Sequence, residues 1–118
     1  MNEPKDHTAL VDSLIKNTTI QESSLTLLGL RVSSLGFRVL NNYQLQAFFE
    51  ISVSGESSLK KNAYYTPGVS LYDENGNILS TEKARLTSEG FLGFESYIFG
   101  FYIDGIALKA KRAKFFIS

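Results

Sequence analysis

The chain has 118 residues, of which 43% are hydrophobic, including 9 Phe and 6 Tyr. This length fits one domain that buries most of its apolar surface without cross-links, and the composition excludes a disordered chain. Twelve basic residues balance twelve acidic ones, which argues against a dedicated binder of nucleic acid or anionic membranes. Cysteine is absent, which excludes disulfides, thiolate catalysis and cysteine zinc sites.

The first residues, MNEPKDHTAL, contain no basic stretch followed by an apolar one, so they predict no secretory signal. No apolar run approaches the length that a membrane-crossing helix needs. Together with the missing cysteines, these features favour a cytoplasmic protein as the default expectation. A chain trimmed from a longer or exported protein would have the same features.

Residues 1–24 are predicted to form an N-terminal segment with a short helix at about 7–17. Two or three helical turns are not stable alone, so this helix must pack against another part of the chain. A lid on a sheet is the favoured interpretation, and a frayed tail or a helix that docks a partner are the alternatives. The apolar side chains recur at spacings of one and four, as on one helical face: Leu10, Val11, Leu14 and Ile15.

From Leu25 onward, apolar and polar side chains alternate as they do in strands with one buried face. The strand-like LGFRVL at 35–40 is followed by NNYQ, which has turn chemistry, so a hairpin with the next strand is predicted. An earlier strand is predicted in LTLLGLRV at 25–32. The clearest alternation is in LQAFFEISVS, whose apolar face comprises Leu45, Ala47, Phe49, Ile51 and Val53.

The segment LYDENGNIL at 71–79 could begin a calcium loop or form a tight turn. An EF-hand loop that starts at Asp73 needs Gly at its sixth position and Glu at its twelfth, where this chain has Ile78 and Ala84. In DENG, Asp stands first and Asn-Gly follows where a positive φ is tolerated. The sequence therefore predicts a hairpin turn and no metal site.

A second hairpin is predicted around Asp104–Gly105, which separates two apolar runs. After Lys111 the apolar positions change parity, and a β-bulge near Arg112 would account for the change. The register set by the turn and the register set by hydrophobicity agree. They would pair Ile103 with Ile106, Phe101 with Leu108, and Phe99 with Ala110.

Residues 25–118 are thus expected to form one domain of about seven strands. The predicted fold class is all-β, an antiparallel two-sheet β-sandwich of immunoglobulin or fibronectin type III style. A small β-barrel is the alternative. The chain has no Trp and no Cys, so the likeness to immunoglobulin domains stops at architecture.

Residues that catalyse reactions or hold metals are scarce. His7 is the single histidine, and its place near the chain terminus is unsuited to a Ser-His-Asp arrangement. The glycines form neither a GxGxxG motif nor a Walker loop. A carboxylate pair of glycosidase type remains an alternative, and Glu95 is of interest because it shares parity with Tyr97. The sequence therefore predicts no enzyme, no cofactor and no metal.

The segment LKAKRAKFF at 108–116 is the one basic cluster, and it is interleaved with aromatic residues. The favoured interpretation is an edge strand whose lysines prevent pairing with other sheets. The alternatives are single-stranded nucleic-acid binding and binding of an acidic protein partner. The acidic residues between 73 and 95 would then be expected to neutralise the basic segment if they lie beside it in the fold. The candidate binding residues are Lys109, Lys111 and Arg112.

Tyr64 and Tyr65 are the second pair of candidate binding residues. They precede a Pro-Gly turn, and adjacent residues of a strand face opposite ways, so at least one ring is expected to be accessible. An accessible ring could stack on a sugar or anchor a protein interface. The alternative is that one ring covers the core while the other packs on the loop.

The functional expectation is a non-catalytic protein-interaction module or assembly subunit. Its partner would be another protein, or a second copy bound through an edge strand. A carbohydrate-binding module that uses the loop tyrosines is the first alternative. Single-stranded nucleic-acid binding through the last strand is the second, and membrane insertion is not expected.

Overall fold

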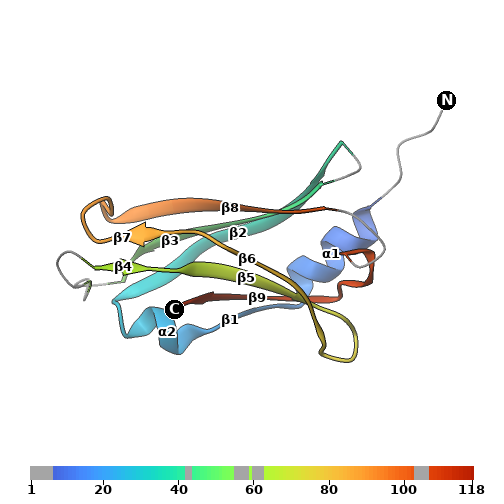
Figure 1. The fold of residues 1–118 in the computed structure, drawn as a ribbon, viewed down its shortest axis with the longest axis horizontal. Coiled ribbons are helices and arrows are strands. Elements are labelled where there is room, and N and C mark those ends of the chain that lie inside the picture. The colour runs from blue at the N-terminus through green and yellow to red at the C-terminus, as the bar shows by residue number, and fades with distance from the viewer. Residues whose placement is uncertain (1–6, 42–43, 55–58, 60–62, 103–106) are drawn as a thin grey trace.

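The computed structural model describes residues 7–41, 44–54, 59, 63–102 and 107–118. Two separate β-sheets pack face to face, which confirms the all-β sandwich and excludes the alternative of a closed barrel (Figure 1). The four-stranded sheet has the order β1 (Thr18–Ile20), β9 (Arg112–Ile117), β5 (Pro67–Tyr72) and β6 (Ile78–Lys83). The three-stranded sheet has the order β2 (Leu30–Leu40), β3 (Gln44–Val53) and β8 (Phe94–Tyr102), and β4 (Tyr64–Tyr65) pairs with β7 (Leu86–Thr87).

The predicted hairpin of β2 and β3 is confirmed. The two strands pair antiparallel, with Phe37 opposite Ala47 and Val39 opposite Leu45. The alternation in β3 gives the burial that the sequence predicted: the inward residues from 45 to 51 are fully buried, whereas Phe48 faces outward and is 38% exposed.

The hairpin turn at DENG is also confirmed, because β5 and β6 pair antiparallel on either side of it. The Asp73 N–H donates to the Asn77 carbonyl at 3.0 Å, and the Gly76 N–H donates to the Asp73 carbonyl at 3.1 Å. Gly76 has φ +83°, a conformation that costs a residue with a Cβ about 1–2 kcal/mol.

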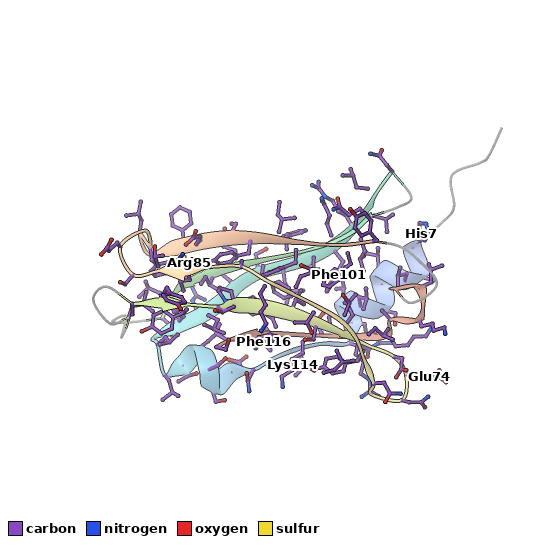
Figure 2. The ribbon with its side chains drawn as sticks, viewed as in Figure 1. His7, Glu74, Arg85, Phe101, Lys114 and Phe116 are labelled. Carbon is purple, nitrogen blue, oxygen red and sulfur yellow. The ribbon has the colours of Figure 1, made fainter. Side chains whose placement is uncertain are left out.

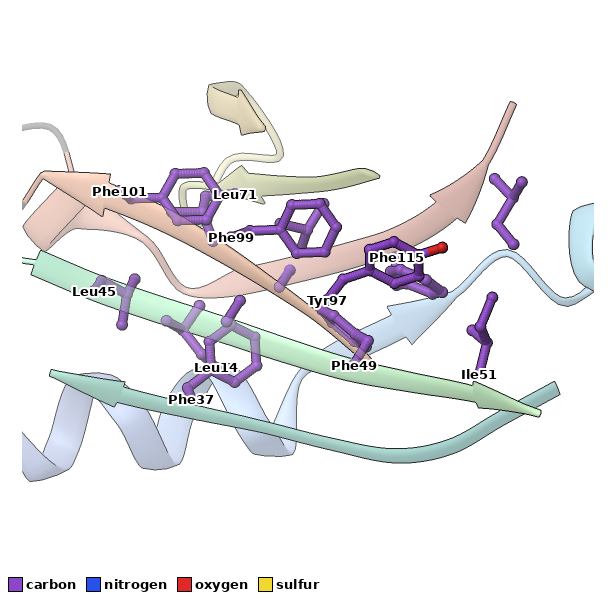
Figure 3. Close-up of a cluster of buried hydrophobic side chains, with 14 of the residues drawn as sticks. Leu14, Phe37, Leu45, Phe49, Ile51, Leu71, Tyr97, Phe99, Phe101 and Phe115 are labelled. Atoms are coloured by element: carbon purple, nitrogen blue, oxygen red, sulfur yellow. The ribbon is translucent and has the colours of Figure 1, made fainter. Parts of the chain in front are cut away.

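The core lies between the sheets and centres on Phe49 of β3 (Figure 3). Its ring stacks on Phe115 of β9, with a centroid distance of 4.3 Å. It also makes edge contacts at 6.3 Å with Phe37 of β2 and with Phe99 of β8. One aromatic cluster therefore joins strands from both sheets.

The N-terminal helix α1 (Thr8–Lys16) packs on the sandwich, because Leu14 is fully buried in the core cluster. After α1, β1 pairs in parallel with β9, with Thr18 opposite Ala113 and Ile20 opposite Phe115. The expectation of purely antiparallel sheets is therefore wrong at this pair. The segment before residue 25 contributes a strand as well as a helix.

The strand predicted at 25–32 is wrong in its first part and correct from Leu30 onward. Residues Glu22–Thr26 form the short helix α2, and the chain turns through Gly29, at φ +68°, before β2 begins at Leu30. A short apolar run is compatible with the period of a helix and with the period of a strand, so the sequence alone does not choose between them. The choice depends on which conformation buries the apolar side chains. As part of α2, Leu25 is fully buried in the core.

The second predicted hairpin is wrong as well. β8 pairs with β3, which places Phe99 opposite Ala47, whereas β9 pairs with β5 and β1 in the other sheet. Asp104–Gly105 lies outside the described residues. Leu108 lies in the 3-10 helix η1 (Ala107–Lys109) and is 45% exposed, so it does not pair with Phe101.

The change of parity after Lys111 also has a different cause from the predicted bulge near Arg112. The chain leaves the three-stranded sheet after β8 and enters the four-stranded sheet at β9, with η1 on the way. Because β9 belongs to another sheet, the parity of its buried residues is independent of the parity in β8. The buried residues of β9 are Ala113, Phe115 and Ile117.

Candidate functional site: an exposed apolar edge strand

β8 is an edge strand of the three-stranded sheet, and its outward face is apolar. Its inward residues are buried, as the alternation requires. The outward side chains of Phe94, Ile98 and Tyr102 are exposed by 65%, 62% and 78%. We call these three residues the β8 stripe. Single exposed apolar residues are common, but a row of three on one edge strand marks an interaction surface.

Phe48 of β3 extends the β8 stripe at its centre, because it lies opposite Ile98. On its other side Phe48 lies opposite Gly36 of β2, and a Cβ at Gly36 would collide with the Phe48 ring. Glycine at 36 therefore lets this ring lie against the sheet. The ring thus leans over β2, and the outward apolar surface runs from Ile98 on β8 across β3 toward β2.

The outward face of β8 carries no charged residue. The positions between the stripe residues are Ser96 and Gly100. On the neighbouring strand, Glu50 accepts hydrogen bonds from Ser33 at 2.9 Å and from Ser96 at 3.4 Å. The nearest outward carboxylate is thus held within the sheet, and the charged residue of β8, Glu95, lies on its inward face beside Tyr97.

The other long edges are protected. β2 has a register shift between Val32 and Ser34, and both α1 and α2 contact it. β6 carries the exposed Glu82 and Lys83. Bulges and charges are the usual devices that prevent edge pairing. Among the described strands, β8 is the long edge without a bulge or an outward charge, with Glu95 on its inward face and part of β6 near it. β1 has only three residues.

The two tyrosines predicted as a site have different environments. Tyr64 is 64% exposed, whereas Tyr65 is half-buried and packs against the core. The Arg85 guanidinium lies over the Tyr64 ring at 4.7 Å from its centroid. The adjoining cavity has a volume of about 140 Å³, which is smaller than typical ligand pockets, and also borders Thr87 and Glu89.

The structure divides the predicted basic cluster between two places. Lys109 and Lys111 share an open cavity of about 470 Å³ with Asp73 and Glu74, so acidic side chains lie close to them as the sequence suggested. Arg112 begins β9, which lies between β1 and β5. The expectation that this segment is an edge strand is therefore wrong.

The Asp73 carboxylate stabilises the turn between β5 and β6 by accepting hydrogen bonds. Its Oδ1 accepts the N–H groups of Asn75 and Asn77 at 2.9 Å, and its Oδ2 accepts the Asn77 side-chain amide at 3.2 Å. These bonds, chiefly that from the Asn77 N–H, lower the pKa of the Asp73 carboxyl. In the described part of the chain, no group of three His, Cys, Asp or Glu residues lies close enough to hold a metal.

Tyr97 is the buried titratable group of the core. Its hydroxyl has no hydrogen-bond partner of standard geometry among the described residues. Burial, and then the neighbouring Glu95 carboxylate, raise the pKa of Tyr97 above its ordinary value. The group therefore stays neutral, with the Glu95 carboxylate as its titratable neighbour.

The β8 stripe was not predicted from the sequence. The predicted second hairpin put Phe99 and Phe101 on one face, which left Ile98 and Tyr102 on the other face without a role. The available signal was the recurrence of large apolar residues every four positions on the face that a half-buried strand turns to solvent.

The fold and this surface define the class of the protein as an all-β sandwich with an open apolar edge. No family model matches the chain, and no curated protein matches it either. The crystal structure of a member of the DUF1425 family from Shewanella sp. pv-4 is similar, with a TM-score of 0.47 and 16% sequence identity over 75% of this chain and 76% of that chain. Within the described residues, no helix combines the length and the apolar character needed to span a bilayer.

Proposed function

We propose that this protein is a non-catalytic assembly subunit that binds a second copy of itself through β8. The observation that carries the proposal is a long edge strand whose outward face is apolar and carries no charge. Strand addition at such an edge gains main-chain hydrogen bonds, and the side chains on its face supply the specificity. A cytoplasmic location and a closer likeness to immunoglobulin-type sandwiches remain expectations from the sequence.

The stripe supports a second copy as the partner because it is self-complementary. Ile98 is the central residue of the nine in β8. An antiparallel two-fold pair centred there places Ile98 opposite its own copy and Phe94 opposite Tyr102 of the second copy. Ser96 then lies opposite Gly100. The three apolar positions meet apolar positions, and no two like charges face each other on the outward side.

The polar positions are also compatible with this register. The Gln44 side chain lies over Gly100, since a Cβ at Gly100 would stand 2.5 Å from the Gln44 amide nitrogen. In the pair, that amide is placed near the Ser96 hydroxyl of the second copy. Side-by-side pairing buries the part of the β8 stripe that faces the second copy together with the main-chain edge, so the interface lies at the small end of the range for specific complexes.

Sedimentation over a range of protein concentrations tests the proposal with two matched variants. Ile98 is 62% exposed on β8, and Ile78 is 63% exposed on β6. We expect the parent and Ile78→Lys to form dimers, and Ile98→Lys to remain monomeric because two lysines would meet at the two-fold axis. A monomeric parent at all concentrations, or equal dimerisation of both variants, would contradict the proposal.

Carbohydrate binding at the tyrosines receives less support. The Arg85 guanidinium covers one face of Tyr64, and Tyr65 is half-buried. Arg85 also lies at the border of the small cavity beside Tyr64. A glycan array with Tyr64→Ala as the control variant would measure this alternative directly.

A further inference from the structure

We infer that the outer face of the four-stranded sheet is a binding site for single-stranded nucleic acid. The register defines this face. Val69 and Leu71 of β5 are fully buried, so the alternate residues Gly68, Ser70 and Tyr72 face outward. Their partners on β9 face the same way: Phe116 lies opposite Gly68, Lys114 opposite Ser70, and Arg112 opposite Tyr72.

The face is positively charged although the whole chain is neutral. On β6, Lys83 lies opposite Gly68 and Thr81 opposite Ser70. The three cations Lys83, Arg112 and Lys114 therefore share the face. No carboxylate occupies an outward position among the paired residues of β9, β5 and β6. Such a segregated field attracts a polyanion even when the net charge is zero.

Two acidic residues lie just beyond this face, in the turn after Tyr72. The Asp73 carboxylate accepts three hydrogen bonds within that turn. Glu74 shares its cavity with Lys109 and Lys111, and it lies apart from Lys114 and Phe116 in Figure 2. Asp73 is thus hydrogen-bonded to amides, and Glu74 has lysine neighbours. Both lie at the end of the basic face and not among its cations.

Phe116 provides a stacking surface. A Cβ at Gly68 would approach two atoms of the Phe116 ring to 2.5 and 2.9 Å, so the ring lies against the bare backbone of β5. A ring that rests on glycine turns its other face outward, and Phe116 is partly exposed. Aromatic faces of this kind stack on bases of any sequence.

A hollow lies beside the cations on the same face. Its volume is about 320 Å³, and its lining includes Tyr72, Arg112 and Lys114. Outward residues along β9 are about 6.6 Å apart, which is comparable to the separation of successive phosphates in an extended strand. An aromatic platform, a row of cations and an open hollow are the features that bind single strands without sequence preference. A flat sheet has no element to enter a duplex groove.

Fluorescence anisotropy with a labelled oligothymidylate of about 15 nucleotides tests the inference in increasing salt. With three cations engaged, log K is expected to fall with log salt at a slope of about −2, and Lys114→Gln should make it shallower by about 0.7. Arg31→Gln, at an exposed position of β2 in the other sheet, is the matched control and should leave the slope unchanged. A salt-independent affinity, or equal effects of the two variants, would overturn the inference.

A second variant separates stacking from charge alone. Phe116→Leu keeps an apolar side chain over Gly68 but removes the ring, so affinity for the oligonucleotide should fall roughly 5- to 100-fold with the salt slope unchanged. Unchanged affinity would contradict a nucleic-acid site. A sulfated polysaccharide, whose affinity the same variant should not change, is the competitor. Equal losses for both ligands would contradict stacking on bases, and circular dichroism verifies that each variant is folded.

Discussion

At the residue scale, the sandwich depends on which side chains of β3 face inward. Phe49 contacts aromatic rings of three other strands, whereas its neighbour Phe48 faces outward. We expect Phe49→Ala to lower the free energy of unfolding by about 3–5 kcal/mol, because it leaves a cavity between the sheets. Phe48→Ala is the control and should cost less than half as much in denaturant unfolding. Equal losses would show that the inward face has been assigned wrongly.

Tyr97 couples the stability of the fold to alkaline pH. Its pKa is raised in the folded state, so its contribution is fully present below the unfolded pKa of about 10 and is lost as the pH rises above that value. Tyr97→Phe should therefore weaken the loss of stability above pH 10. At neutral pH the effect of Tyr97→Phe should be small, within about 1 kcal/mol, because the buried hydroxyl that it removes neighbours the Glu95 carboxylate.

Thermal unfolding of both proteins from pH 7 to pH 11 measures this effect. The parent and Tyr97→Phe should diverge as the pH passes 10. Parallel curves across the whole range would mean that the hydroxyl is hydrated or hydrogen-bonded.

At the element scale, strands with a locally defined partner were predictable from sequence. β3 alternates along its length except at Phe48, and the sequences NNYQ before it and DENG at 73–76 have the residue types that turns require. The same local evidence failed for β8 and β9. Asp104–Gly105 favours a hairpin, but Phe99 and Phe101 pack more completely when β8 pairs with β3 and faces β9 across the core.

The candidate site was only partly predictable for a related reason. The exposure of Tyr64 and the acidic neighbours of Lys109 follow from local patterns, and both were expected. The β8 stripe depends on which strand lies at the edge, and that is decided by strand order, which no local pattern records. The parallel pairing of β1 with β9 is non-local in the same way.

The helix α1 is an integral part of the sandwich rather than an appended tail. Leu14 is fully buried, whereas the adjacent Ile15 is 45% exposed. Leu14→Ala should lower the free energy of unfolding by about 2–5 kcal/mol, and Ile15→Ala should cost much less. Chemical denaturation measures both. If the two variants were equally stable, α1 would be detachable from the core.

At the scale of the whole molecule, the two sheets offer surfaces of opposite character. The three-stranded sheet has the apolar edge at β8, and the four-stranded sheet has the basic outer face of β5, β6 and β9 (Figure 1). Because they lie on different sheets, a second copy and a polyanion could bind at the same time. A dimer through β8 would join two three-stranded sheets into one of six strands.

Cysteine cross-linking tests the central claim most directly, because the native chain has no cysteine. Ile98→Cys places one thiol on the proposed two-fold axis, at a spacing that permits a disulfide between copies. Ile78→Cys places an equally exposed thiol on β6. Under mild oxidation we predict a rapid disulfide-linked dimer for Ile98→Cys and only slow collisional cross-linking for Ile78→Cys. Equal rates for the two variants, or faster cross-linking at Ile78, would contradict assembly through β8.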